Sequence, residues 1–208
     1  MQKLRIKGTA MVTPEQVLSY WVDVVGPVGW YSGSIELDAD VRERFSTTWF
    51  EARTGACGLW LTSPVGTLGY IVLTDQLPRN MYRGHADAFA TDQSARAAAK
   101  IAIERDWDLR IPEPVRQFFY LPLMHSENLI DQDRCCRLIK TRMMKGGSEN
   151  LRHARCHREI IRQFGRFPFR NEALGRATTA SEAYWIKQGG YASTLRTIDA
   201  KYSVKKYV

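Results

Sequence analysis

Two segments of the sequence place an arginine and an asparagine shortly after a proline. Leu77–Asn80 reads as an apolar residue, proline, arginine and asparagine, and Gly165–Asn171 repeats this order with Phe169 as one extra residue. Each segment follows an apolar, helix-like run, where a proline stops the helix and the next residues can turn inward. Arginine carries a permanent charge on a planar fork of N–H donors, so converging arginines require carboxylates or an external anion. We therefore expect two Arg-Asn corners that either bind an anion or stabilise the fold.

The candidate ligand-binding residues lie at these corners, beside them and in one aromatic loop. They are Asp75, Arg79, Asn80, Arg83, Asp92, Arg166, Arg170, Asn171, Trp30 and Tyr31. The four arginines of this set face its two aspartates and Glu127, which leaves one positive charge for an anionic ligand to neutralise. A structural network in which each aspartate pairs with an arginine explains the same residues equally well.

Trp30 and Tyr31 stand in a predicted loop after Gly29. Small-molecule sites are mostly apolar, with a few fixed polar groups that orient the ligand. Aromatic residues at helical spacing usually belong to the core, but a pair in a loop does not follow that pattern. We therefore predict that Trp30 and Tyr31 form a lid over the ligand site.

Proton transfer or metal binding would depend on a few histidines and carboxylates. His125 and Glu127 form the expected proton-transfer pair, with His157 as a third candidate catalytic residue. Two imidazoles and a carboxylate are also a ligand set for a divalent transition metal. Because no short ligand motif is present, we favour histidines that hydrogen-bond to the backbone and predict no metal site. The sequence identifies no cofactor.

Capping residues, prolines and glycines divide the chain into predicted helices. Thr13 and Gln16 form a capping box around Pro14. Ser63 precedes a second helix-opening proline, and Asp38 is expected to cap the helix that lies between these two. Thr91 with Asp92 is expected to cap the helix 91–105, and Thr179 with Glu182 forms a second capping box. The predicted helices cover residues 13–25, 38–53, 63–76, 91–105, 112–124, 129–144, 148–164 and 179–189.

Pro122 lies inside the predicted helix 112–124, where it removes a hydrogen bond and clashes with the preceding turn. We therefore expect a kink that turns His125 toward the interior. Apart from a weak case at Arg5–Val12, no segment alternates apolar and polar residues over the length of a strand. The sequence predicts a single all-α domain over residues 1–208, with about seven or eight antiparallel helices.

The net charge of +8 is attributed mainly to the two ends of the chain. Residues 1–12 and 191–208 are predicted to be basic, peripheral tails, which leaves about +2 for the rest of the chain. A nucleic-acid-binding face requires a cluster of basic residues on a folded element. Nucleic acid is therefore an unlikely partner by this reasoning.

The cysteines and the hydropathy of the chain bear on its compartment. Its four cysteines show no C-x-x-C spacing and include the neighbours Cys135 and Cys136, which is a poor disulfide framework. The basic start lacks the apolar run of a signal peptide, and no stretch reaches the length of a membrane span. We expect a cytoplasmic protein without a membrane-spanning segment.

Several motifs occur in a fixed order along the chain: Asp75–Asn80, Arg83-Gly84, Ala88–Asp92, Leu121-Pro122, His125–Glu127, Asp131-Gln132, His157, Gly165–Asn171 and Leu174–Arg176. With these motifs, the chain from about Val17 to Arg176 resembles the bacterial domain-of-unknown-function 924 family. The resemblance implies a tetratricopeptide-like, right-handed stack of antiparallel helical hairpins and no assigned activity. The chain departs from the family at Met124, where a glutamate is usual, at Phe169, where a histidine is usual, and at Leu77, where phenylalanine is common.

Two functions remain open at this stage. The first is a pocket lined by Arg, Asn, Asp and His that binds or transforms a small anionic metabolite. The second is a tetratricopeptide-like interaction module whose arginines hold a peptide carboxylate. An enclosed pocket with aromatic walls would favour the metabolite, and an open groove would favour the peptide.

Overall fold

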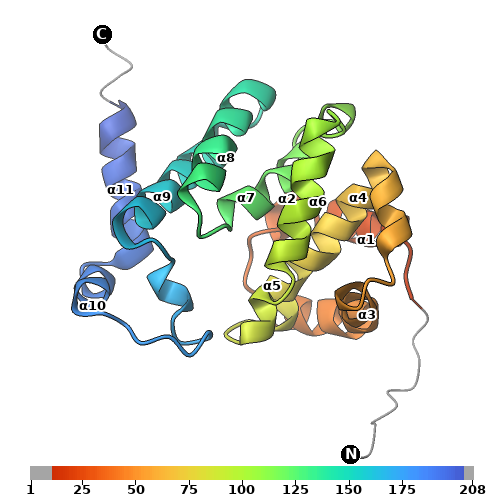
Figure 1. Cartoon of the computed structure of the whole chain (residues 1–208), viewed down its shortest axis with the longest axis horizontal. Helices are drawn as coiled ribbons and strands as arrows, with labels where there is room; N and C mark the ends of the chain where they lie inside the picture. The colour runs from red at the N-terminus through yellow and green to blue at the C-terminus, as the bar shows by residue number, and fades with distance from the viewer. Residues whose placement is uncertain (1–10, 204–208) are drawn as a thin grey trace, which may run out of the picture. The chain divides into compact units, whose positions relative to one another are not determined.

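The computed structural model describes residues 11–203, and every regular element among them is helical (Figure 1). The predicted all-α class is confirmed, because residues 11–203 contain no strand. The weak strand expected at Arg5–Val12 falls almost wholly outside the described residues, as do the basic ends 1–10 and 204–208.

The described chain divides into two compact units. Unit 1 contains residues 11–83 and 87–110, and unit 2 contains residues 84–86 and 111–203. The single domain and the right-handed stacking of hairpins both stay predictions.

Unit 1 is a succession of short helices around one buried segment. Its elements are α1 (Pro14–Leu18), the π-helical η1 (Ser19–Val25), α2 (Gly26–Gly29), α3 (Ile35–Arg53), η2 (Gly58–Thr62), α4 (Pro64–Ile71), the π-helical η3 (Val72–Gln76), α5 (Leu77–Met81), α6 (Asp92–Glu104) and η5 (Asp108–Arg110), with η4 (Ala86–Phe89) between α5 and α6.

The centre of unit 1 is α4 with its continuation η3, as the sequence predicts. Every residue from Gly66 to Pro78 is buried, and α4 contacts both α1 and α6. The contact with α1 is close, because a Cβ added at Gly69 would lie 2.6 Å from the Cβ of Pro14. This packing fixes η3 and the corner that follows it inside the unit.

The capping signals were correct at three of the helix starts and wrong at two, Asp38 and Thr91. The hydroxyl of Thr91 makes no capping bond and donates to the carbonyl of Thr74. The capping box of Thr13, the Ser63 cap and the capping box of Thr179 are confirmed. Asp38 does not cap α3, because Ser34 accepts a hydrogen bond from the backbone N–H of Leu37 at 3.1 Å. Asp38 thus lies in the first turn of α3, and its carboxylate is available to other partners.

Unit 2 begins with two short helical segments rather than with one kinked helix. Its elements are η6 (Val115–Phe119), α7 (Leu121–Met124), α8 (Leu129–Arg142), α9 (Ser148–Phe164), η7 (Pro168–Arg170), α10 (Ala180–Lys187) and α11 (Gly190–Ser203). The predicted kink at Pro122 is wrong, because Pro122 stands in the first turn of α7. A proline costs no hydrogen bond there, since the first N–H groups of a helix have no intrahelical partner.

The last helix corrects the expectation of a peripheral tail from residue 191 onward. In α11, Ile198 is 5 % exposed, and Tyr191, Leu195 and Tyr202 pack against the same core cluster as α9. These four residues recur at helical spacing and form one apolar stripe. The overall polarity of the segment had masked this stripe.

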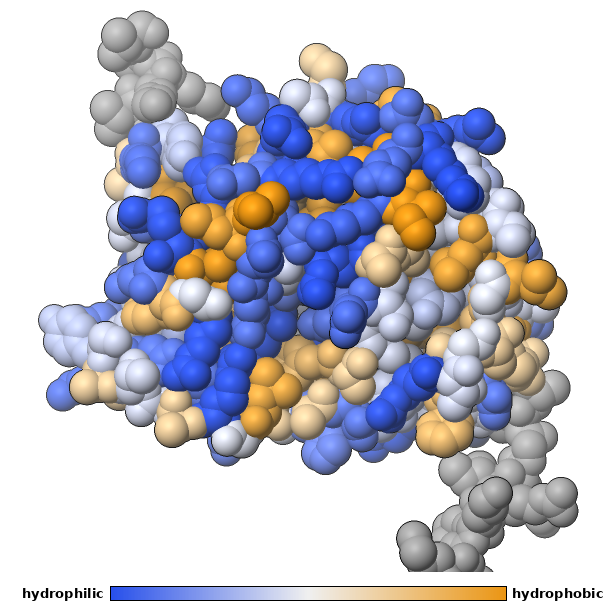
Figure 2. All heavy atoms as spheres, viewed as in Figure 1, coloured by the Kyte–Doolittle hydropathy of each residue, from blue (hydrophilic) through white to orange (hydrophobic). Residues whose placement is uncertain are grey.

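The surface of the described chain mixes polar and apolar side chains. On the face drawn in Figure 2, the exposed apolar residues are separated by hydrophilic ones. None of the helices within residues 11–203 combines the length and the apolar character that a membrane crossing requires. The cytoplasmic location stays a prediction.

Candidate functional site

The first Arg-Asn corner is held together by carboxylates of unit 1. Asp75, at the end of η3, is fully buried, and Arg79 follows it by one helical turn. Arg79 Nη2 lies 2.6 Å from Asp92 Oδ1 and 3.8 Å from Asp75 Oδ1. Arg79 Nη1 donates to the carbonyl of Ala88, and the guanidinium carbon lies 4.7 Å from the ring centroid of Phe89. The charge of Arg79 is therefore matched within the unit.

Asp38 is a third carboxylate at this corner, and sequence reasoning missed its role there. It accepts hydrogen bonds from Arg83 Nε at 2.7 Å, Arg83 Nη2 at 2.9 Å and Asn80 Nδ2 at 2.8 Å. Burial acts to raise the pKa of Asp38, but the hydrogen bonds from Arg83 and Asn80 outweigh it and lower the pKa. Asp38, four positions after the true cap Ser34, was itself interpreted as the cap, and this concealed its pairing with Arg83.

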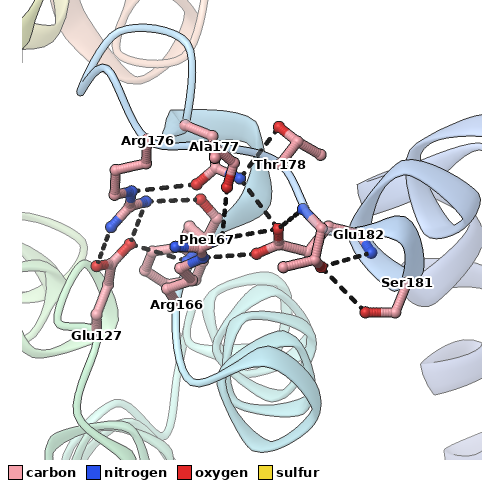
Figure 3. A network of polar contacts seen from close by, with 10 residues as sticks. Glu127, Arg166, Phe167, Arg176, Ala177, Thr178, Ser181 and Glu182 are labelled. Atoms are coloured by element: carbon pink, nitrogen blue, oxygen red, sulfur yellow. Dashed lines mark hydrogen bonds and ion pairs between the residues drawn. The ribbon is translucent and has the colours of Figure 1, made fainter.

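The second corner joins the end of α9 to the start of α10 (Figure 3). Arg166 makes a bidentate pair with Glu182, with Nε–Oε1 at 2.6 Å and Nη2–Oε2 at 2.8 Å. Glu182 also accepts from the backbone N–H of Thr179 at 2.7 Å, so it serves both the capping box and the ion pair. The hydrogen bond from Arg166, supported by Thr179, lowers the pKa of Glu182 to about 2.

Glu127 occupies the other side of this corner (Figure 3). Its carboxylate accepts from Arg176 Nη1 at 2.7 Å, Arg176 Nη2 at 3.0 Å and the backbone N–H of Phe167 at 2.8 Å. Burial acts to raise the pKa of Glu127, but the hydrogen bonds of Arg176 and Phe167 and the charge of Arg170 lower it overall. Glu127 is thus an ionised acceptor that stabilises the corner. Arg176, which was absent from the candidate set, could have been found from the motif Leu174–Arg176.

The charge count made from the sequence omitted two carboxylates. Asp38 pairs with Arg83, and Glu182 pairs with Arg166. Neither carboxylate belonged to the candidate set, so the inferred surplus of one positive charge does not follow. A ligand at either corner has to be argued from geometry instead.

The histidines His125 and His157 lie close together in unit 2, with ring centroids 6.4 Å apart. His157 Nδ1 is 2.9 Å from the carbonyl oxygen of His153. A carbonyl oxygen can only accept, so Nδ1 carries the proton and Nε2 is the unprotonated nitrogen of the neutral ring. Burial lowers the pKa of His157 to about 3, which keeps the ring neutral at pH 7.

The hydroxyl of Tyr191, which α11 supplies, lies within hydrogen-bonding distance of two histidines of α9. It is 2.7 Å from His153 Nδ1 and 3.4 Å from His157 Nδ1. The helix that was expected to be peripheral therefore closes one side of the histidine cluster.

Arg170 and His157 contact the same aromatic ring. The guanidinium carbon of Arg170 lies 4.5 Å from the ring centroid of Phe167, and the His157 ring meets Phe167 edge-on at 5.4 Å. Arg170 is 6 % exposed, so its permanent charge lies in a poorly hydrated environment. Phe169, where the family usually has histidine, stacks on Phe167 at 5.2 Å and is 49 % exposed.

The structure separates the two residues of the predicted lid. Trp30 is buried, and its Nε1 donates to the carbonyl of Trp21 at 2.7 Å, which anchors the loop in the core. Tyr31 is 64 % exposed. Trp30 therefore has a structural role in unit 1, and the contact of Tyr31 with a ligand stays a prediction.

The candidate residues fall into two groups, one in each unit. Unit 1 brings together Asp75, Arg79 and Asp92, and separately Asn80 with Arg83. In unit 2, His125 and His157 lie together, and His157 and Arg170 share Phe167. Glu127 and Arg166 belong to the network of Figure 3. Asn171 Nδ2 donates to Glu182 at 3.3 Å. One site made from both corners stays a prediction. Within residues 11–203, no group of three or more His, Cys, Asp and Glu side chains has the geometry of a metal site.

A groove of about 450 Å³ in unit 1 contains none of the candidate residues. It is lined by Val12, Gln16, Ser19, Tyr20, Val24, Arg44 and Phe45. Its charged residue, Arg44, pairs with Asp40 at 2.7 Å, and Asp40 also accepts from the Tyr20 hydroxyl at 2.6 Å. The sequence offered no signal for this groove, because its lining residues belong to no motif.

Comparisons with known proteins agree with the resemblance seen in the sequence. A solved structure of a protein of unknown function, ATU0120 from Agrobacterium tumefaciens, is similar to this chain with 36% sequence identity and a TM-score of 0.78. The similarity covers 84% of this chain and 97% of that chain. No curated protein matches the chain. Residues 17–190 match the bacterial protein family of unknown function DUF924, and the chain belongs to that family.

Proposed function

We propose that the protein binds a small anionic molecule at the second corner, beside Arg170. The observation that carries this proposal is that Arg170 and His157 contact the same ring, that of Phe167, at 4.5 and 5.4 Å. In this arrangement, the guanidinium of Arg170 is a fixed positive charge, and the neutral ring of His157 is a nitrogen base close to it. The charge would bind an anion, and the base would accept a hydrogen bond from a neighbouring hydroxyl or protonated group of the same ligand.

The electrostatics of unit 2 support the same proposal. The charge of Arg170 contributes to lowering the pKa of both Glu127 and His157, although burial is the main cause for His157. An anion placed against Arg170 would oppose this field and raise the pKa of His157. Anion binding should then be accompanied by proton uptake, and affinity should increase as the pH falls toward the pKa of His157.

If a reaction follows binding, we assign the proton transfer to His125 and His157 rather than to Glu127. Glu127 already accepts three hydrogen bonds and has a lowered pKa, so it would be a weak base. His157 Nε2 is the unprotonated nitrogen of a neutral ring, and His125 is partly exposed, so His125 can exchange protons with solvent. Asn171 and Arg166 hold the corner in place through Glu182.

A thermal melt with and without anions tests the proposed function. An anion at about ten times its Kd should raise the Tm of the wild type by about 3–6 °C. The anions to compare are inorganic phosphate, citrate and adenosine monophosphate, at constant ionic strength. The variant Arg170→Gln should lose this rise, whereas Arg196→Gln, the same charge change on the exposed side of α11, should keep it. An Arg170→Gln protein that is folded and still gains Tm as the wild type does would overturn the proposal.

A second candidate function is peptide binding by the same corner. The exposed Phe169 ring, stacked on Phe167, favours it because an open aromatic surface can receive a peptide side chain. Arg170 would then bind the carboxylate at the C-terminus of the peptide. Phe169→Ala separates the two functions, because it should weaken peptide binding and leave the binding of inorganic phosphate unchanged.

A further inference from the structure

The net charge of +8 conceals two units of opposite charge. Residues 11–83 and 87–110 contain nine Lys and Arg and thirteen Asp and Glu, a net charge of −4. Residues 111–203 contain sixteen Lys and Arg and nine Asp and Glu, a net charge of +7. The chain ends do carry most of the net charge, but the small remainder combines a negative unit 1 with a positive unit 2. The excess lies on folded helices of unit 2.

The hairpin of α8 and α9 gathers part of this charge on one side. A short turn joins the two helices, so they run antiparallel, and Arg158 Nη1 lies 3.2 Å from Asp133 Oδ1. In an antiparallel pair, moving one turn forward along α8 corresponds to moving one turn back along α9. Arg137 thus comes level with Ala154 and beside Arg155.

On α9, Arg155, Arg158 and Arg162 follow one another at spacings of three and four residues and share one side of the helix. The stripe continues onto α11, because the guanidinium carbon of Arg155 lies 3.7 Å from the ring centroid of Tyr202. The charge of Lys201 acts on Glu159, so Lys201 lies on the same side.

These residues define the basic face of unit 2. It consists of Arg137, Lys140, Arg155, Arg158, Arg162 and Lys201. Its two carboxylates are Asp133, which pairs with Arg158, and Glu159, which pairs with Arg162. The face keeps a net charge of +4, and neighbouring like charges of this kind favour an anionic partner.

We propose that the basic face binds the phosphodiester backbone of a nucleic acid. Four of its six basic residues are arginines, whose planar fork matches phosphate oxygens better than an ammonium does. The guanidinium of Arg155 lies over the ring of Tyr202, the aromatic residue next to this face, so that ring is already engaged by a cation. Binding should accordingly depend on the backbone and show little sequence preference.

Fluorescence anisotropy with the full-length protein tests this proposal. The probes are fluorescein-labelled duplex DNA and single-stranded RNA, each of about 20 nucleotides per strand, titrated between about 50 and 200 mM KCl. Log Kd should rise linearly with log salt, with a slope of about 0.9 for each neutralised phosphate of duplex DNA and about 0.7 for a single strand. The difference in Kd between the two probes shows whether the face prefers duplex DNA or single-stranded RNA.

The variant Arg137→Gln with Arg155→Gln removes two charges from solvent-accessible positions of the face. It should weaken binding by about tenfold or more at low salt and reduce the slope by about 1–2. Arg44→Gln with Arg105→Gln makes the same charge change in unit 1 and should leave binding unchanged. Circular dichroism melts of both variants show whether either change affects the fold.

Three outcomes would overturn the proposal: no binding at the lowest salt, equal weakening by the unit 1 variant, or tighter binding of polyglutamate or anionic lipid vesicles than of nucleic acid. This test does not depend on the small-anion site proposed at Arg170. Arg170→Gln should remove anion binding at that site and leave nucleic-acid binding by the basic face intact.

Discussion

The carboxylate of Glu182 accepts hydrogen bonds from both Nε and Nη2 of Arg166, at 2.6 and 2.8 Å, across the turn from α9 to α10. Glu182 is 2 % exposed and also caps its own helix through Thr179. One side chain thus fixes the start of α10 and the guanidinium of the preceding corner, so these two features should be lost together.

This relationship predicts acid sensitivity. The pKa of Glu182 in the folded protein is about 2, against an ordinary value of 4.5, so its contribution to stability is complete above about pH 4.5 and disappears as the pH falls toward 2. The Tm of the wild type should therefore decline through this window. Glu182→Gln should have a lower Tm at pH 7 and a flatter decline, and calorimetry at several pH values measures both. An unchanged pH profile in the variant would contradict the assignment.

The lowered pKa of His157 predicts a second loss of folding stability at acidic pH. Its pKa falls from an ordinary 6.5 to about 3, so the folded state favours the neutral ring, and the stabilisation present above pH 6.5 declines as the pH falls toward 3. Nitrogen-15 NMR should show Nδ1 protonated and Nε2 unprotonated at pH 7, with no titration of His157 between pH 5 and 8. In urea, the same resonance should titrate near 6.5. Titration near 6.5 in the folded protein would refute the buried, neutral ring.

α11 is expected to be essential for the stability of unit 2. Ile198→Ala removes a buried side chain that is 5 % exposed and should lower the free energy of unfolding by about 2–4 kcal/mol in urea titrations. Thr197→Ala, at the neighbouring exposed position, is the control and should change it by less than about 0.5 kcal/mol. Equal effects of the two substitutions would mean that α11 is not part of the core.

The first corner should behave as a structural pair. Arg79→Ala leaves Asp75, which is fully buried, without the cation 3.8 Å away and should cost about 3–5 kcal/mol of folding free energy. Arg53→Ala breaks the exposed pair with Asp87 and should cost less than about 1 kcal/mol. Urea unfolding of both variants checks the difference. A stable Arg79→Ala protein would instead indicate that Arg79 serves a ligand.

Local signals in the sequence predicted much of the helical framework. The capping boxes of Thr13 and Thr179 and the cap at Ser63 are properties of a few adjacent residues, so they can be read without tertiary information. The glycine that ends α9, Gly165, has φ +70°, which residues with a side chain adopt less readily.

The remaining features depend on which distant residues meet. Glu127 and Arg176 are 49 positions apart, and nothing in either local segment indicates that they pair. The same holds for Asp38 and Arg83, whose pairing was hidden because an aspartate near a helix start also suits a cap. Pro122 was misread for a related reason: a proline inside a helix and a proline that begins one look alike when the preceding turn is short.

Because η3 is π-helical, the geometry of the first corner depends on the number of residues in this segment. A π turn accommodates one residue more than an α-helical turn, and η3 lies between the buried helix α4 and the corner that carries Asp75 and Arg79. Removal of a single residue from Val72–Thr74 would restore a regular α-helix and rotate everything after it by about 100°. Asp75 would then point to a different side of unit 1, although no side chain of the corner had been replaced. Members of the family that lack this extra residue would therefore build a different corner from the same amino acids.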